Sequence, residues 1–506
     1  MLLAGISILS WLEAALTALL ALGLLLTVSR HLWTLRWTLS RDRGSALPLP
    51  KGSMGWPFFG ETLHWLVQVK YKREHKYGHV FKTHLLGKPV IRVTGAENIR
   101  KILLGEHSLV STQWPQSTQI ILGSGTLLNS IGELHRQRRK VAFSRAALES
   151  YLPGIQKVVS WELRGWCREP GSIAVYSSAK TLTFRVAARV LLGLSLEEKQ
   201  FKDLAKTFEQ LVENLFSLPL NIPFSGLRKG IKARDMLHEY MEKAIMEKLQ
   251  RKNSEGHSDA LDFLINSAKE HGKEFTMQEL KESAIELIFA AFFTTASAST
   301  SLILLLLKHP SAIEKIRQEL VSHELHGQCH CLSPAPEMNL DKLSRLRYLD
   351  CVIKEVLRVL PPVSGGYRTA LQTFELDGYQ IPKGWSVMYS IRDTHETAAV
   401  YQSPPESFDP DRFGSARQED GKGAGRFHYI PFGGGVRSCI GQELAKAILK
   451  LLAIELVSTA RWELATPSFP EMQTVPIVHP VDGLQLFFHP LQPGGASPRR
   501  QVSREA

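Results

Sequence analysis

Apolar residues dominate the first 29 positions of the chain, where Glu13 is the single charged residue. Residues 14–28 carry no charge, and about 20 apolar residues suffice to span a bilayer. Arg30 and Arg36 follow this stretch, and positively charged residues remain on the cytoplasmic side of a membrane. The pattern predicts a transmembrane helix over residues 1–30 with the body of the protein in the cytosol. A cleaved signal peptide is the alternative, but it would need a basic start and a small-residue cleavage site.

The stretch that follows the apolar segment differs from it in composition. Trp33 and Trp37 are typical of the membrane interface. The prolines at 48 and 50 favour an extended, stiff linker, so residues 31–52 are expected to form a basic, proline-rich hinge. At the other end, residues 491–506 are rich in Pro, Gly, Ser and Arg and are expected to be disordered. Residues 53–490 are left as one folded domain.

Within that domain the spacing of apolar residues is mostly helical. Residues 77–93 and 371–390 alternate as strands do, whereas residues 96–308 follow the helical period. Residues 277–308 give the clearest helix, with Thr276 as N-cap and Pro310 just beyond its end. It is apolar nearly all round, which indicates a central core helix; a second membrane span is disfavoured by its hydroxyl residues. The fold class predicted is mainly α with smaller β-sheets (α+β).

Charge and cysteine content narrow the class of protein. The net charge of +12 favours an anionic membrane surface or an acidic partner, and no nucleic-acid motif accompanies it, so nucleic acid is not expected as a ligand. Five scattered cysteines do not make a disulfide framework, so a reducing compartment is expected. His326, Cys329, His330 and Cys331 lack the paired spacing of a structural zinc site. We therefore expect no metal site at this His/Cys cluster. We also expect the protein to be a monomer.

Residues 432–441 read Phe-Gly-Gly-Gly-Val-Arg-Ser-Cys-Ile-Gly, and a helical pattern begins directly afterwards. Glycines let the backbone approach a flat macrocycle, and backbone N–H groups near a thiolate tune its electron donation. Arg437, two residues before Cys439, suits a haem propionate. The alternative is a buried structural cysteine in a glycine loop. The complete pattern favours a haem-iron ligand at Cys439.

A carboxylate and a guanidinium lie one helical turn apart at Glu355 and Arg358, flanked by apolar residues. Downstream, the sequence Pro-Asp-Arg-Phe at 410–413 places Arg412 where it can join them. A buried Glu–Arg–Arg cluster is expected, which is poor evidence for stability but can fix a geometry.

These three motifs, in this order, resemble those of the cytochrome P450 superfamily over nearly the whole chain. The resemblance implies the cytochrome P450 fold with its long central helix, and haem b bound through the Cys439 thiolate. It implies a haem-binding set made up of Cys439, Arg437, Arg368, His135, Arg139, Phe432, Gly435 and Gly441. Thr294 matches the oxygen-activating threonine of the central helix, and O2 is the co-substrate.

Further segments resemble the retinoic-acid hydroxylase branch, family 26, and within it subfamily C. They include residues 47–62, 214–219, 223–226 and 374–385. This likeness implies hydroxylation of all-trans retinoic acid at its 4-position. The positions that match the retinoid pocket are Trp114, Phe216, Phe289, Val363, Gly366 and Tyr367. Arg92, helped by Lys88, is the candidate partner of the substrate carboxylate, because a guanidinium binds a carboxylate with two hydrogen bonds. A related lipid or terpenoid acid is the alternative substrate.

The chain departs from the family pattern in two respects. Phe293 stands where an acidic residue ordinarily precedes the threonine, which removes one route for protons. Residues 139–145 and 68–73 are shorter than the family pattern, the first by about one helical turn. A catalytically impaired haem-binding homologue is therefore a further alternative.

The resemblance also implies an electron donor and a location. NADPH supplies electrons through a flavoprotein reductase, and Lys446 and Lys450 are candidate contacts for its acidic face. The anchor and the family together imply the endoplasmic reticulum membrane, with membrane lipid around the first helix.

Overall fold

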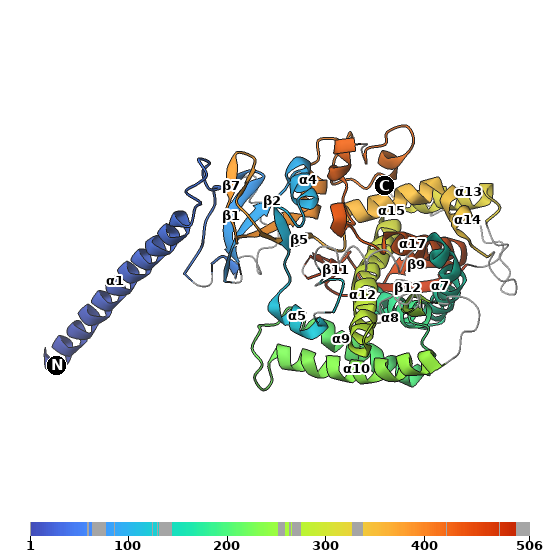
Figure 1. The fold of residues 1–506 in the computed structure, drawn as a ribbon, viewed down its shortest axis with the longest axis horizontal. Helices are drawn as coiled ribbons and strands as arrows, with labels where there is room; N and C mark the ends of the chain where they lie inside the picture. The colour runs from blue at the N-terminus through green and yellow to red at the C-terminus, as the bar shows by residue number, and fades with distance from the viewer. Residues whose placement is uncertain are drawn as a thin grey trace, which may run out of the picture. The chain divides into compact units, whose positions relative to one another are not determined.

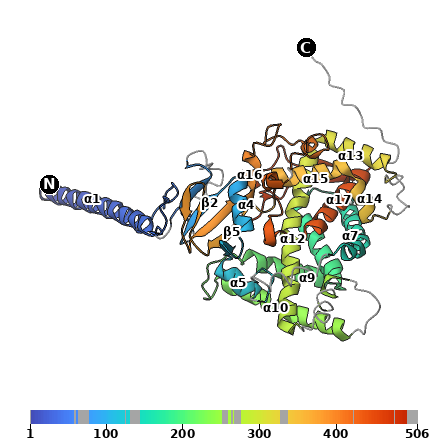
Figure 2. The same ribbon diagram turned by 45° about the horizontal axis from the view of Figure 1, so that its top comes forward.

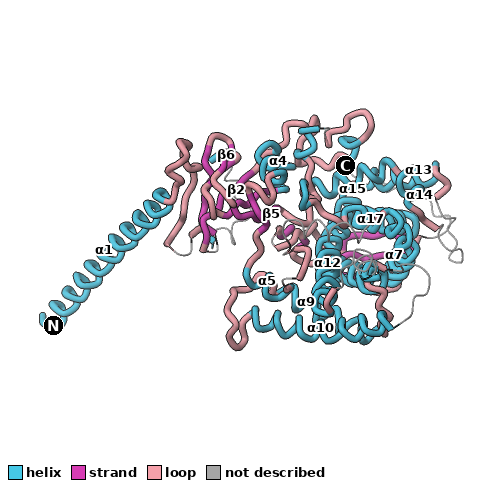
Figure 3. Tube along the Cα trace, in the orientation of Figure 1, coloured by secondary structure: helices cyan, strands magenta, loops and turns pink. Residues whose placement is uncertain are grey.

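The computed structural model describes residues 2–57, 60–62, 77–85, 87–123, 125–128, 130, 144–250, 259–262, 265, 275–325, 337–420, 423–474 and 476–491. The chain forms two compact units, the first made of Met1–Gln113 with Gly365–Asp393 and the second of Trp114–Ser364 with Thr394–Ala506. Strands gather in the first unit and helices dominate the second (Figure 3). Mainly α with smaller sheets was the predicted class, and the structure confirms it.

The first unit carries the long N-terminal helix α1 (Leu2–Leu39) and a mixed sheet in the order β1-β2-β8-β5-β3 (Figure 1). In this sheet β2 and β8 pair in parallel, whereas the other neighbouring strands pair antiparallel. The sheet strands are β1 (Val80–Leu85), β2 (Lys88–Val93), β3 (Val110–Thr112), β5 (Gly365–Ala370) and β8 (Ser386–Ser390). Helix α4 (Ala96–Leu104) and the hairpin of β6 (Phe374–Leu376) and β7 (Tyr379–Ile381) complete the unit.

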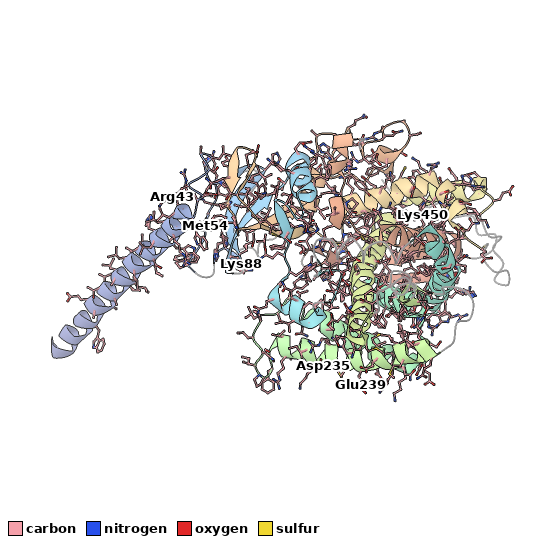
Figure 4. All side chains as sticks on the ribbon, viewed as in Figure 1. Arg43, Met54, Lys88, Asp235, Glu239 and Lys450 are labelled. Carbon is pink, nitrogen blue, oxygen red and sulfur yellow. The ribbon has the colours of Figure 1, made fainter. Side chains whose placement is uncertain are left out.

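Two tryptophans, Trp33 and Trp37, dock the end of α1 onto this sheet, and their expected place at a membrane interface stays a prediction. Trp33 is buried and donates from Nε1 to the carbonyl of Met54 at 3.3 Å. Trp33 and Trp37 both pack on the ring of His84 in β1, with centroids 5.0 and 5.5 Å away, and Trp37 also meets Trp385. Met54 is labelled near the end of α1 in Figure 4. The last two turns of α1 are therefore part of the folded unit.

The proline-rich segment after α1 also differs from the expected hinge. Helix α1 runs on to Leu39, through the first nine residues of the stretch 31–52. Beyond it, the backbone carbonyl of Pro48 accepts from Gln380 N–H at 3.0 Å, and that of Lys51 accepts from Lys82 N–H at 2.8 Å. These bonds attach the segment to β7 and β1, and an isolated bridge pairs Gly52 with Lys82.

The second unit is a helical body around α12 (Met277–Lys308), which passes between α8 and α17 (Figure 1). Its other helices are α5 (Gln116–Leu122), α7 (Arg145–Trp166), α8 (Val175–Val186), the π-helix Ala187–Leu191, α9 (Glu198–Glu213), α10 (Gly226–Gln250), α13 (Pro310–Ser322), α14 (Leu340–Arg345), α15 (Arg347–Val359) and α17 (Gln442–Thr459). Figure 2 shows α9 and α10 beside α12. Helix α16 (Ile391–Thr397) contains the boundary between the units.

Short elements close the second unit. Three 3₁₀ turns lie at Pro410–Phe413, Gly423–His428 and Gly435–Arg437. The strands are β4 (Ile173–Ala174), β9 (Ala460–Leu464) and β12 (Gln485–Pro490) in one sheet, and β10 (Met472–Gln473) and β11 (His479–Pro480) in another.

Helix α12 has the bounds expected from the sequence because its end signals are strong. The Thr276 hydroxyl accepts from the Glu279 N–H, and the Glu279 carboxylate accepts from the Thr276 N–H, so the two residues form a capping box. Of the described helices, residues 13–39 of α1 and the whole of α12 are long and apolar enough to span a membrane. The apolar span in α1 is exposed, whereas 72% of the apolar stretch of α12 is buried inside the protein, which makes α12 a core helix.

Candidate functional site

The loop 432–441 presents Cys439 at the start of α17. Gly433 and Gly435 have φ of 67° and 65°, in the left-handed region that only glycine adopts without strain. Cys439 donates its backbone N–H to the carbonyl of Phe432 at 2.9 Å, which closes the loop, and Gly441 caps α17. The Cys439 side chain is exposed, so the expected alternative of a buried structural thiol does not describe this structure.

The residues around Cys439 fit a flat haem. Apart from their chain neighbours, no heavy atom of the described residues lies within 4 Å of the position that a Cβ would take at Gly433 or Gly441. On α12, Ala290 is exposed and Thr294 is half-buried, although the helix is otherwise a core helix. Cys439 offers an accessible thiol among glycines, and α12 has an open face in the same unit. A haem bound through a thiolate requires such an accessible thiol.

Arg437 is directed towards the segment that follows α5. Its guanidinium donates to the carbonyls of Leu127, at 3.4 Å, and Ser130. The same segment is held from the other side by α12: Glu282 accepts from Gly125 N–H at 2.6 Å, and Glu286 accepts from Leu127 and Leu128 N–H. Sequence reasoning missed both glutamates. The sequence signal that could have pointed to them is a pair of carboxylates four residues apart, on one face of a mostly apolar helix.

The Glu–Arg–Arg cluster forms inside the second unit, as the sequence led us to expect. Arg358 donates to Glu355 through Nε at 2.7 Å and a second nitrogen at 2.9 Å, and Arg412 donates through Nε at 3.2 Å. All three side chains are at most 1% exposed. Burial opposes the charge on Arg358, but the hydrogen bonds that Arg358 donates to Glu355 outweigh it and raise the Arg358 pKa. Asp409 and Glu419 also bond within this cluster.

Thr294 and Phe293 have different surroundings on α12. The Thr294 hydroxyl donates to the carbonyl of Ala290 at 2.7 Å, one turn earlier. Phe293 packs edge-on against Phe292, with centroids 4.5 Å apart, and Lys180 lies 5.9 Å above its ring. Lys180 is paired with Glu209, so a charged pair lies beside the position where the family ordinarily has an acid.

The candidate substrate residues are divided between the units. Trp114, Phe289 and Val363 are half-buried in the second unit, whereas Phe216 is 51% exposed on the segment after α9. Gly366 and Tyr367 lie on β5 in the first unit, and Arg92 lies on β2.

Arg92 belongs to a row of side chains across three neighbouring strands. In register, Arg92 pairs with Met388 of β8, and Met388 pairs with Tyr367 of β5. Cross-strand partners stand on one face, so the guanidinium, thioether and phenol lie side by side. Arg92 contacts Met388 Sδ at 3.1 Å and approaches Asp393 at 3.7 Å. Burial raises the Tyr367 pKa, against the opposing charge of Arg92.

Arg368 has a carboxylate partner within the first unit. Its Nε donates to Glu106 at 2.7 Å, and a second nitrogen donates to the Tyr367 carbonyl at 2.8 Å. Both Arg368 and Glu106 are buried. The structure therefore shows Arg368 as part of an ion pair that joins β5 to the segment before β3.

Several expected residues fall outside the described ranges. They are His135 and Arg139 of the basic run, most of the segments 68–73 and 139–145, and the cluster of His326, Cys329, His330 and Cys331. In the described parts of the chain, no group of three or more His, Cys, Asp or Glu side chains is arranged to hold a metal ion.

Lys450 was expected on the surface as a reductase contact, and this expectation was wrong. Its side chain is 8% exposed, pairs with Asp350 at 2.8 Å and donates to the Leu343 carbonyl at 2.7 Å (Figure 4). It joins α17 to the neighbouring helices α14 and α15. Lys446 is more exposed, pairs with Glu443 and lies 5.7 Å over the Phe432 ring beside the cysteine loop.

Comparison with known proteins identifies the family. The cytochrome P450 family model matches residues 50–487. Cytochrome P450 26C1 of Homo sapiens is 67% identical and the match covers 97% of this chain and 98% of that protein. Cytochrome P450 26B1 of Rattus norvegicus is 59% identical, with 96% of each chain covered. Among solved structures, a retinoic-acid-bound cyanobacterial P450, CYP120A1, has 35% identity and a TM-score of 0.79, covering 88% of this chain and 100% of that one.

The resemblance and the enzyme class expected from the motifs are thus confirmed. Haem bound through a cysteine thiolate follows from the family. The chain belongs to the cytochrome P450 monooxygenases, in retinoic-acid hydroxylase family 26, and is more similar to the subfamily C enzyme than to subfamily B.

Proposed function

We propose that this protein hydroxylates all-trans retinoic acid at the 4-position and so contributes to its removal. The likeness to subfamily C of family 26 carries this proposal. When bound, thiolate-ligated haem activates O2 for insertion of one oxygen atom into a C–H bond. In this proposal Cys439 supplies the thiolate and Arg437 binds a propionate. Further propionate contacts are Arg368, His135 and Arg139, and the loop is shaped by Phe432, Gly435 and Gly441.

Thr294 holds a proton on the open face of α12. Its hydroxyl donates to Ala290, and reorientation of that one bond directs the proton outward from the helix. Since Phe293 offers no acid, Thr294 with ordered water supplies protons in this protein.

Arg92 is the residue that binds the substrate carboxylate. It stands in the row with Met388 and Tyr367, its side chain is 18% exposed, and its approach to Asp393 at 3.7 Å is longer than a hydrogen bond. A guanidinium binds a carboxylate with two hydrogen bonds. Trp114, Phe216, Phe289, Val363, Gly366 and Tyr367 provide the apolar contacts for the polyene and ring.

The proposal is tested by turnover of all-trans retinoic acid with NADPH and a flavoprotein reductase. We expect 4-hydroxyretinoic acid and a substrate-induced spin shift; haem-loaded protein that gives neither would contradict it. Arg92→Ala should raise KM for retinoic acid about tenfold or more, because hydrogen bonds to charged groups are strong, and should leave KM for neutral retinol unchanged. Arg100→Ala, which removes an exposed pair with Glu97, is the matched control.

The electron donor and the location belong to the same proposal. We place the protein in the endoplasmic reticulum membrane through α1, as a monomer surrounded by lipid, with Lys446 on the face that meets the reductase. Neutralising Lys446 should slow reduction more at low salt than at high salt, because salt screens exposed charges. Retention of the full chain in membranes after alkaline extraction, with residue 1 still present by N-terminal sequencing, supports an anchor; loss of the first residues indicates a cleaved signal peptide.

A further inference from the structure

His395 is a buried imidazole outside all the sequence motifs. It lies in α16, in the part that belongs to the second unit, and its side chain is fully buried. Both ring nitrogens are used. Nδ1 lies 3.2 Å from the carbonyl oxygen of Arg358, and Nε2 lies 2.9 Å from the backbone nitrogen of Ile430.

The two partners fix the protonation state of the ring. Ile430 N–H is a donor, so Nε2 accepts from it; the Arg358 carbonyl is an acceptor, so Nδ1 carries the proton and donates. Only the neutral imidazole with its proton on Nδ1 makes both bonds. Burial lowers the His395 pKa to about 3, which keeps the ring neutral at neutral pH.

The two hydrogen-bond partners of His395 belong to the ion-pair cluster and to the approach to the cysteine loop. Arg358 stands in the last turn of α15, where carbonyls lack helical partners, and its side chain binds Glu355. Ile430 begins the approach to the cysteine loop: its carbonyl accepts from Gly433 N–H, and two residues later Phe432 accepts from Cys439 N–H. His395 thus joins the helix of the ion-pair cluster to the start of the loop.

The neighbouring residue makes a parallel connection. Tyr429 stacks on His395, with ring centroids 5.6 Å apart, and its hydroxyl donates to the carbonyl of Lys354 at 3.1 Å. Lys354 and Arg358 are one turn apart on α15. Tyr429 is therefore bonded directly to the carbonyl of Lys354, and Ile430 is connected through His395 to the carbonyl of Arg358, one turn later on the same helix.

We propose that His395 is a positioning residue that holds the cysteine loop against α15 and so keeps the Cys439 thiolate in place on the haem iron. The proposal rests on Cys439 as the haem ligand, as in the proposed function. It connects the buried Glu355–Arg358 pair to the cysteine loop, because the imidazole joins the backbone of Arg358 to that of Ile430.

Substitution by Phe tests the role, because it keeps a ring to stack on Tyr429 and removes both hydrogen bonds. In full-length, haem-loaded, reduced protein with carbon monoxide, we expect His395→Phe to lose the Soret band of thiolate-bound iron about tenfold faster than the wild type, since one buried donor and one buried acceptor are left unpaired. His395→Gln, which retains an acceptor near Ile430, should lose it at an intermediate rate. Tyr429→Phe removes the parallel bond to Lys354 and tests that connection separately. Thr459→Ala, which removes a hydroxyl bond at the far end of α17, is the control.

A second readout separates positioning from general stability and does not depend on catalysis. Hydrogen exchange of the peptide 430–439 should accelerate in His395→Phe, while peptides of α7 keep the wild-type rate. Loss of the thiolate band only in parallel with global unfolding, followed by far-ultraviolet circular dichroism, would overturn the proposal, as would an unchanged band and unchanged exchange. If His395→Phe does not fold, the rate in His395→Gln decides in the same way. A wild type with a stable thiolate band but no retinoic-acid turnover overturns the substrate and leaves His395 testable; a wild type without the band overturns both.

Discussion

Glu286 of α12 accepts a hydrogen bond from the backbone N–H of Leu128 at 2.6 Å, and the neighbouring N–H of Leu127 donates to the same carboxylate at 2.7 Å. Together with Glu282 on Gly125, this attaches the segment after α5 to the core helix. The carbonyls of Leu127 and Ser130 in turn receive Arg437, so one short segment links α12 with the cysteine loop.

Glu286→Ala should therefore loosen this segment. Hydrogen bonds to charged groups contribute about 1.5–3 kcal/mol each, so we expect a loss of a few kcal/mol in the free energy of local opening. Hydrogen exchange of the peptide 123–130 measures this, and Glu239→Ala, which removes an exposed pair with Lys243, is the control. Equal exchange in both variants would contradict the role.

Thr294→Ala should uncouple oxygen consumption from product formation. The substitution removes the hydroxyl that donates to Ala290 and that is proposed to direct protons to bound oxygen. We therefore expect several-fold more hydrogen peroxide per molecule of hydroxylated product. Thr300→Ala, whose hydroxyl bonds to Ala296 deep in the same helix, is the matched control. An unchanged ratio of peroxide to product would remove Thr294 from proton delivery.

Glu355→Gln should prevent stable haem incorporation. It leaves Arg358 buried without its carboxylate and Arg412 with only its longer ion pair to Glu419, at 3.4 Å. Breaking a buried pair from one side costs about 3–5 kcal/mol. The measurement is the haem-to-protein ratio after purification, together with the midpoint of thermal unfolding. Asp411→Asn, which removes the exposed pair with Lys315, should change neither quantity.

The acid limb of the stability curve should depend on His395. Its folded pKa, about 3, is below the unfolded value near 6.5, so its contribution is complete above pH ~6.5 and is lost as pH falls towards 3. Burial is the main cause, and the charge of Arg358 adds to it, while the bond to the Arg358 carbonyl opposes it. Between these limits we expect about 1.4 kcal/mol lost per pH unit from this residue. Denaturant titrations at several pH values should show a shallower acid slope in His395→Gln; an unchanged slope would contradict this.

Replacement of both docking tryptophans, Trp33→Ala with Trp37→Ala, should release the end of α1 from the sheet. Removing a buried aromatic side chain costs about 3–5 kcal/mol. We expect protease cleavage within residues 40–57 to accelerate strongly. Trp11→Ala, at a position 76% exposed on the same helix, should leave the cleavage rate unchanged.

The sequence predicted elements best where local signals agree. Thr276 as N-cap and the proline at 310 predicted the bounds of α12, and the spacing of Glu355 and Arg358 predicted their ion pair. Arg412 joined them from a motif 54 residues later, which a recognised order of motifs made predictable.

Contacts between distant segments were not predictable in this way. Lys450 reads as a solvated charge because its partners, Asp350 and the Leu343 carbonyl, lie about 100 positions earlier in the chain. His395 carries no local signature of burial, and Trp33 and Trp37 look alike whether a membrane or a sheet covers them. In each case packing against a remote segment decided the role of a side chain whose own neighbours were uninformative.

The docking of Trp33 and Trp37 has a consequence for how a fat-soluble acid reaches this protein. If α1 crosses the bilayer as proposed, the membrane span continues into the turns that pack on β1 of the sheet bearing Arg92. A retinoid in the leaflet would keep its tail in the hydrocarbon and its carboxylate at the water boundary. Under the proposed function, this docking would limit the angles at which Arg92 meets that boundary, and the orientation of the span would then affect substrate capture.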